Sequence, residues 1–283
     1  MGLGWILPGY GKNDHFLYLC PMQLFHRHFG KEGNPPLVIL HGLFGISDNW
    51  VMFGKQMAAE GFEVFIPDQR NHGRSEWSDE FNYLAFTNDL YDFLDAEEIE
   101  NPVLLGHSMG GKVAMRFAVS YPDLVQKLIV VDIAPKPYEI KTQHLHMIKA
   151  MLAMDLTNIK SRTEAEEQLA KIITDRRIRQ FILKNLYRKE KNGFGWRLYL
   201  EAIADNLDKM FDAIPEESRY SKLALFVKGG LSDYILPEDK GLILRHFPQA
   251  KIVTIPNASH WVHADVPDDF FSLIKDFVTE ETP

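Results

Sequence analysis

The sequence predicts an α/β domain built on a mostly parallel sheet that is flanked by helices. Short aliphatic runs alternate with amphipathic segments along much of the chain. Residues 37–40 (Leu-Val-Ile-Leu) carry no polar position, which is typical of a strand buried on both faces. Residues 83–94 instead repeat apolar side chains at helical spacing. Alternation of this kind favours a parallel sheet with crossover helices.

The expected elements follow one another regularly as far as about residue 135 and resume after residue 218. A strand pattern begins at Met22, and further strands are expected at 37–40, 63–66, 103–105, 128–131, 223–227 and 251–255. Helices are expected at 83–94, at 112–121 and, closing the chain, at about 268–279. The carboxyl ends of parallel strands meet at one edge of a sheet, so residues that follow these strands are candidates for a site.

The alternation stops between Lys136 and Ser218, where no convincing strand is present and helical patterns prevail. We therefore expect a helical cap at 136–218, inserted after the strand that ends at Asp132. The sheet domain would then consist of residues 22–135 and 219–283. No internal repeat or low-complexity segment is present.

Glycines and prolines punctuate residues 1–21, which lack the basic start, long apolar core and cleavage site of a signal peptide. We expect a loosely packed N-terminal extension, or a start codon placed upstream of the true one.

Composition excludes several classes of function. The formal charge of −8 gives no general attraction to nucleic acid or anionic lipid, and we interpret the cluster Arg176, Arg177 and Arg179 as a solvated helix face. Cys20 is the single cysteine, so an intrachain disulfide is impossible and a cysteine-based zinc site is not expected. No apolar run approaches the length of a membrane span. These features predict a cytoplasmic protein.

A Gly-x-Ser-x-Gly motif occupies residues 106–110, between the strand at 103–105 and the helix that follows. A nucleophilic serine on a tight strand-to-helix turn needs glycines around it, because neighbouring backbone passes close. The helix N-terminus points at the serine, where its free N–H groups favour developing negative charge. We therefore predict that Ser108 is a nucleophile rather than part of a plain glycine turn.

A serine hydroxyl is too weakly acidic to attack unaided, so it needs a histidine held by a carboxylate. In this order of elements the histidine follows the last strand, where His260 lies. Two aspartates compete for the role of the acid: Asp132 follows the strand at 128–131, and Asp233 follows the next strand. Both strand ends border the expected position of His260, so these considerations leave both open.

Acyl transfer develops negative charge on the carbonyl oxygen, which two backbone N–H groups usually receive. One is expected from Met109, immediately after the nucleophile, and the other from Leu43 in the glycine-containing loop 41–45. The polar loop 68–75 is expected to brace that loop, with His72 in a structural role.

Other chemistry-bearing side chains have simpler interpretations. His144 and His146 lack an accompanying carboxylate or cysteine framework, so we expect a solvent-facing helix start and no metal site. His263 is interpreted as a pocket-wall or structural residue. Met147 begins a stripe of methionines at helical spacing, which predicts either a packing stripe or the wall of an acyl pocket.

Together these motifs resemble the YbfF-type esterase branch of the α/β-hydrolases, over essentially Met22 to the C-terminus. The matching segments are 41–45 with 48–50, 68–75, 106–112, 131–135 and 258–264. The resemblance implies an α/β-hydrolase fold with a helical cap and carboxylesterase or acyl-thioesterase activity, with no metal and no organic cofactor. It also favours Asp132 over Asp233, because the Val-Asp-Ile-Ala-Pro segment looks like a family feature. Ser259 stands where relatives often have glycine.

The leading hypothesis is hydrolysis of a short- to medium-chain acyl ester or thioester through an acyl-serine intermediate. Two alternatives keep the same triad: a carbon–carbon lyase of the menaquinone-synthase type, and a non-catalytic receptor that binds a ligand in the pocket. The expected partner is a small-molecule acyl ester or thioester. Sequence leaves the oligomeric state open.

Overall fold

The computed structural model describes residues 21–189 and 193–280. The predicted N-terminal extension, residues 1–21, lies outside these ranges except for its last residue.

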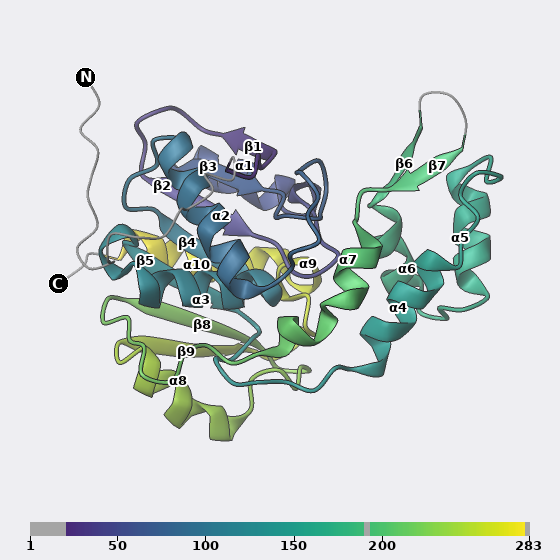
Figure 1. The fold of residues 1–283 in the computed structure, drawn as a ribbon. Helices are drawn as coiled ribbons and strands as arrows, with labels where there is room; N and C mark the ends of the chain where they lie inside the picture. The colour runs from purple at the N-terminus through teal and green to yellow at the C-terminus, as the bar shows by residue number, and fades with distance from the viewer. Residues whose placement is uncertain (1–20, 190–192, 281–283) are drawn as a thin grey trace, which may run out of the picture.

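Within the described residues, seven strands form one sheet in the order β1-β3-β2-β4-β5-β8-β9 (Figure 1). β1 runs antiparallel to β3 and every other neighbouring pair is parallel, which confirms the predicted mostly parallel sheet. β1 begins at His26, four residues after the strand pattern expected from Met22. The bounds are β1 (His26–Phe29), β2 (Pro36–Leu40), β3 (Glu63–Pro67), β4 (Val103–His107), β5 (Lys127–Val131), β8 (Ala224–Gly229) and β9 (Ala250–Ile255).

Helices cover both faces of this sheet because successive side chains of a buried strand point to opposite sides. On one face Leu37 and Ile39 of β2 join a core that includes Phe270 and Ile274. On the other, Val38 and Leu40 join a second core. The first face is covered by α1 (Val51–Ala59) and α10 (Pro267–Thr279), and the second by α2 (Tyr83–Ala96), α3 (Met109–Ser120) and α8 (Lys240–His246).

The chain between β5 and β8 forms a lobe beside the sheet (Figure 1). Its helices are α4 (Thr142–Leu152), α5 (Arg162–Ala170), α6 (Arg176–Leu183) and α7 (Leu200–Asp205). The expectation that this stretch contains no strand was wrong, because β6 (Leu186–Arg188) pairs with β7 (Phe194–Trp196) as an antiparallel hairpin. Strands of three residues are too short for side-chain alternation to stand out in a sequence.

One buried lysine of α3 joins the two connections between lobe and sheet. The Lys112 ammonium donates hydrogen bonds to the backbone carbonyls of Lys136, where the chain enters the lobe, and Asp212, where it returns. The bond to Asp212 measures 2.7 Å. Lys112 is 1% exposed, and burial lowers its pKa to about 7. The lobe is therefore attached at both ends to α3, the helix that follows Ser108.

Candidate active site

Ser108 occupies a strained turn between β4 and α3, with φ of 53° and ψ of −117°. The turn needs glycine on both sides. A Cβ atom on Gly106 would lie 2.2 Å from the carbonyl oxygen of Gly110, and one on Gly110 would lie 2.3 Å from that of Leu40. Neighbouring backbone is thus too close for any side chain, which is the physical basis of the motif. The turn presents the Ser108 hydroxyl to a cavity.

A chain of hydrogen bonds runs from Ser108 to a buried carboxylate. The Ser108 hydroxyl lies 3.0 Å from Nε2 of His260, and Nδ1 of His260 lies 2.8 Å from Oδ2 of Asp132. Asp132 is fully buried and also accepts hydrogen bonds from the Gly229 amide, at 2.9 Å, and from the Ser232 hydroxyl. Residues from three strand ends therefore meet in the arrangement of a Ser-His-Asp triad.

The alternative aspartate lies elsewhere. The Asp233 side chain is 73% exposed and pairs with Lys141 of the lobe, with 2.5 Å between Oδ1 and Nζ. That hydrogen bond holds the pKa of Asp233 below its ordinary value. The structure thus brings Asp132, and not Asp233, into contact with His260.

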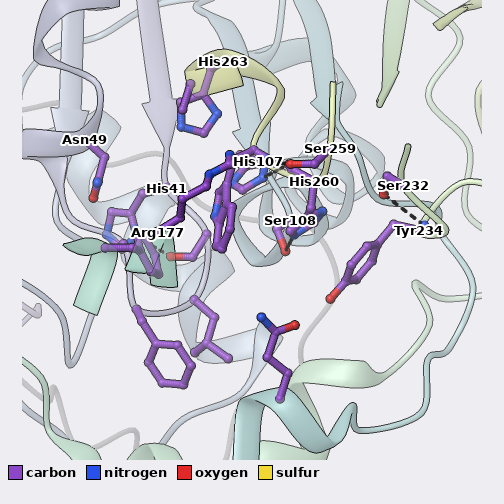
Figure 2. A pocket seen from close by; sticks show the side chains of 18 of the residues that line it. His41, Asn49, His107, Ser108, Arg177, Ser232, Tyr234, Ser259, His260 and His263 are labelled. Atoms are coloured by element: carbon purple, nitrogen blue, oxygen red, sulfur yellow. Dashed lines mark hydrogen bonds between the residues drawn. The ribbon is translucent and has the colours of Figure 1, made fainter. Parts of the chain in front are cut away.

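Two neighbouring rings hold His260 in place (Figure 2). His107 donates from Nε2 to the backbone carbonyl of His260 at 2.8 Å, and burial lowers the pKa of His107 well below its ordinary value. A neutral His107 can make this bond without adding charge beside the site. On the cavity side the Tyr234 ring stacks on His260, with centroids 4.0 Å apart and planes 18° apart. His260 is therefore held by its backbone carbonyl and by one face of its imidazole ring.

The two expected oxyanion donors are both close to Ser108: Met109 follows it in sequence, and Leu43 approaches it in space. Neither the Leu43 nor the Met109 amide donates a hydrogen bond to another described residue. Leu43 lines the cavity, and Met109 begins α3. Gly42 brings the Leu43 loop against the nucleophile, since a Cβ there would lie 3.2 Å from that of Ser108. Both amides therefore keep a donor close to Ser108 that no described residue uses, and their role as oxyanion donors stays a prediction.

The loop that carries Leu43 is braced by neutral histidines. His41 accepts a hydrogen bond from the Gln69 amide at 2.9 Å, and His72 accepts one from the Phe44 amide at 3.2 Å. Burial lowers the pKa of His41 to about 4 and that of His72 to about 3, so each ring keeps a nitrogen lone pair near neutral pH. The predicted bracing of loop 41–45 by loop 68–75 thus has a direct counterpart in the structure.

The cavity in front of Ser108 has a volume of about 530 Å³ and lies between the sheet and the lobe. Its apolar wall comes from both parts of the chain, among them Leu43, Phe44, Met147, Phe181 and Trp261. Met147 is buried and lines the cavity, so the methionine stripe serves both packing and wall. A volume of this size suits a small organic molecule.

Among the polar side chains of the wall, His144 differs from expectation and His263 agrees with it. His144 was predicted to face solvent but lines the cavity, and burial lowers its pKa to about 4. Arg177 was assigned to a solvated face, and its side chain is 59% exposed; it also borders the cavity, where it pairs with Asp265. His263 lies in the wall and stacks on Trp50, with centroids 4.0 Å apart.

Some residues of the site have no clear sequence signal. Tyr234 and Ser232 approach His260 and Asp132 only because the turn after β8 folds back towards β5. Arg177, Gln180 and Lys184 line the cavity from α6 and the residue after it. Their spacing of three and four residues places them on one face of a helix. This shared face is the one feature of the sequence that could have indicated a common role for them.

Within the described ranges, no group of three or more His, Cys, Asp or Glu side chains is arranged to hold a metal ion. No helix in those ranges is both long enough and apolar enough to cross a membrane.

The fold and site define a class of protein. Residues 35–267 match the family model described as the alpha/beta hydrolase fold, and the chain belongs to this family.

Particular relatives narrow the branch to esterases. The chain is 42% identical over 273 residues to the sn-1-specific diacylglycerol lipase ABHD11 of Danio rerio, covering 94% of this chain and 86% of that one. It is 31% identical over 256 residues to esterase YbfF of Escherichia coli, covering 88% and 95%. A solved marine microorganism esterase superposes with a TM-score of 0.87 at 41% identity, covering 90% and 99%. The predicted resemblance to the YbfF-type esterase branch is confirmed.

Proposed function

We propose that this chain is a serine hydrolase that cleaves short- to medium-chain acyl esters or thioesters through an acyl-serine intermediate. The observation that carries the proposal is the unbroken hydrogen-bond chain from the Ser108 hydroxyl through His260 to Asp132, at the edge of a substrate-sized cavity. The esterase and lipase names of the relatives support ester substrates.

In the acylation step, His260 takes the proton from the Ser108 hydroxyl while the oxygen attacks the substrate carbonyl. The tetrahedral oxyanion is received by the Leu43 and Met109 amides, which have no other acceptor among the described residues. The bond to the leaving group then breaks, and His260 gives its proton to the departing alkoxide or thiolate. Asp132 orients the imidazole and stabilises its positive charge.

In the deacylation step, water replaces the leaving group. His260 takes a proton from the water as its oxygen attacks the acyl-serine carbonyl, and the same two amides receive the oxyanion. Collapse of this intermediate releases the carboxylic acid and returns the proton to Ser108. Both steps use one base and one oxyanion site, so no metal or organic cofactor is needed for the chemistry.

We propose further that residues 136–218 act as a cap that selects the acyl group. Support comes from the cavity wall, which Met147 and Phe181 of the lobe complete opposite Ser108 and Leu43 of the sheet domain. The enclosed volume of about 530 Å³ favours acyl chains of short to medium length.

The first test is hydrolysis of p-nitrophenyl esters with acyl chains from two to sixteen carbons, by the wild type and by Ser108→Ala. We expect wild-type turnover with a clear chain-length optimum and a loss of at least about 10⁴-fold in Ser108→Ala. Rapid quenching and mass spectrometry should detect the acyl group on the peptide that contains Ser108.

If neither protein hydrolyses any ester, the proposal is wrong and the two alternatives separate by their products. Pyruvate elimination from a suitable intermediate would identify the carbon–carbon lyase. Stoichiometric binding of a ligand without turnover would identify the receptor.

A further inference from the structure

A second cavity adjoins the first and is strongly basic. It has a volume of about 580 Å³ and lies where the β6–β7 hairpin and the start of α5 meet loop 68–75. Lys184 lines both cavities, which are therefore neighbours. The other basic side chains in the wall of this second cavity, the basic pocket, are Arg74, Arg162, Arg188 and Arg197.

In the part of the chain that the structure describes, no carboxylate forms an ion pair with any of the five basic side chains of this pocket. Asp48 is the one carboxylate in its described wall, and Asp48 pairs with Arg27 instead. Five such cations around one cavity are unexpected in a chain of net charge −8.

Aromatic rings hold three of the guanidinium groups. The Arg74 group lies 4.7 Å from the centre of the Phe25 ring, and the Arg188 group lies 5.0 Å from that of Phe194. The Arg197 group lies 5.6 Å from the Tyr187 ring. Stacking over a ring limits the rotation of a guanidinium while N–H groups at its edge can still bind an anion. On Arg188, Nη2 donates to the Lys160 carbonyl at 3.2 Å, so the remaining N–H groups of this side chain are the ones an anion could use.

The backbone beneath these side chains is also fixed. The Gly73 amide donates to the Arg197 carbonyl at 2.7 Å, and the Arg197 amide donates to the Asn185 carbonyl at 2.9 Å. These bonds hold loop 68–75 against the hairpin. Arg162 is anchored by hydrogen bonds to the carbonyls of Leu183 and Leu186, at 2.8 and 2.6 Å. The basic groups are therefore organised before any ligand binds.

Planar guanidinium groups match phosphate oxygens with paired N–H donors, so a cluster of them favours phosphate over a neutral polar group. Ser161 and Arg162 also place the N-terminus of α5 at this cavity, and a helix N-terminus adds to the positive potential. The cavity beside Ser108 has an apolar wall suited to an acyl chain, whereas the wall of the basic pocket is mostly charged and suits an anion.

We infer that the basic pocket binds a phosphate carried by the leaving group of the substrate, whose acyl part lies beside Ser108. This inference rests on the proposed function. The substrate class is then an acyl ester or thioester whose alcohol or thiol is phosphorylated, and Lys184 lies between the two parts of the bound molecule.

The test compares two esters that differ only in the phosphate: monobutyrylglycerol and butyrylglycerol 3-phosphate. Release of butyric acid gives kcat/KM for each, and the ratio on the same protein cancels any change in the folded fraction. We expect the wild type to prefer the phosphorylated ester by at least about 10-fold, since several charged hydrogen bonds are gained. Arg188→Gln/Arg197→Gln should reduce that ratio to below about 2.

The matched control is Lys240→Gln/Arg245→Gln, which removes the same charge from exposed positions on α8. It should keep the wild-type ratio. A wild-type ratio near one, or an equal fall in both variants, would overturn the inference. Calorimetric binding of pyrophosphate without any kinetic preference would equally overturn the assignment to the leaving group.

Failure of the proposed function has a different signature. Ser108→Ala would then hydrolyse both esters as fast as the wild type, or neither protein would hydrolyse either ester, whatever the phosphate contributes.

Discussion

The two walls of the cavity at Ser108 hold their polar side chains in different ways. On the sheet side, Asp132 accepts three hydrogen bonds, and His107 is committed to the His260 carbonyl. On the lobe side, Nδ1 of His144 is buried and has no hydrogen-bond partner among the described residues. The same holds on the sheet side for Nδ1 of His263, which is not one of the residues of the triad. Lys141 pairs with the largely exposed Asp233 at the rim.

This difference separates two tasks. Groups that take part in a reaction at Ser108 need fixed positions, so the sheet domain satisfies them with short hydrogen bonds and burial. Groups that recognise a substrate must have free donors and acceptors to offer it, and the lobe leaves several facing the cavity. We therefore expect substitutions in the sheet wall to reduce turnover and substitutions in the lobe wall to change selectivity.

The largest effect should come from the buried carboxylate. Asp132→Asn should lower kcat for p-nitrophenyl butyrate by about 10³- to 10⁴-fold, because the amide favours the wrong tautomer of His260. Asp233→Asn is the matched control, since it makes the same change at an exposed aspartate and should cost less than about 3-fold. Equal losses in the two variants would contradict the role of Asp132.

The next effect should come from the loop beside the nucleophile. A Cβ atom on Gly42 would lie 2.9 Å from Nδ1 of His107 and 3.2 Å from the Cβ of Ser108. Gly42→Ala should therefore displace the Leu43 amide and lower kcat by about 10²-fold, as loss of an oxyanion donor does. Gly241→Ala has open space around its Cβ and should leave kcat unchanged. Wild-type turnover in Gly42→Ala would remove Leu43 from the oxyanion site.

The attachment of the lobe gives a pH-dependent prediction. The pKa of Lys112 is lowered from 10.5 to about 7 in the folded protein. Between these two pH values Lys112 is protonated in the unfolded chain and largely deprotonated in the folded protein, so unfolding takes up a proton. Wild-type stability due to this group therefore rises with pH above 7, by at most about 1.4 kcal/mol per unit. Lys112→Met has no titrating group at this position and therefore lacks this pH-dependent contribution to stability. The free energy of unfolding of the wild type minus that of the variant should grow by about 2 kcal/mol between pH 7 and 9.

Urea unfolding monitored by circular dichroism at several pH values measures this difference. Lys240→Met, at an exposed position on α8, is the control and should show no such trend. A difference independent of pH for Lys112→Met would show that the buried ammonium stays charged throughout this range.

The smallest effect should be a change in selectivity. Met147→Ala enlarges the cavity from the lobe side and should move the preferred acyl chain to a longer length, with about a 3- to 10-fold loss for the wild-type optimum. Met151→Ala removes the same atoms from the same helix at a buried position that does not line the cavity. It should lower stability without moving the optimum, and an equal shift in both would contradict a direct role for Met147.

Much of the fold followed from local pattern. Aliphatic runs such as 128–131 mark buried strands because a parallel strand covered by helices on both faces has no polar position. The β6–β7 hairpin escaped prediction because each strand has three residues and its stability comes from packing on the rest of the lobe.

The candidate residues of the site likewise divide into those that local sequence identifies and those that it does not. Ser108 was found from its immediate neighbours, since the glycines that its turn requires lie two residues away on either side. The choice between Asp132 and Asp233 had no local answer. β5 and β8 are adjacent parallel strands, so their ends lie at the same edge of the sheet.

By itself, the sequence determined the mostly parallel sheet, the strand-to-helix turn at Ser108 and the position of His260 after the last strand. Those features depend on side-chain periodicity and on backbone crowding, which short segments encode. The residues themselves left both aspartates open, with only the family resemblance favouring Asp132, and the tertiary structure places Asp132 against His260. Tertiary structure alone decided which lobe residues face the cavity and that five basic side chains share one pocket. Such features depend on the directions of side chains from segments far apart in sequence, which are set only when the lobe packs against the sheet.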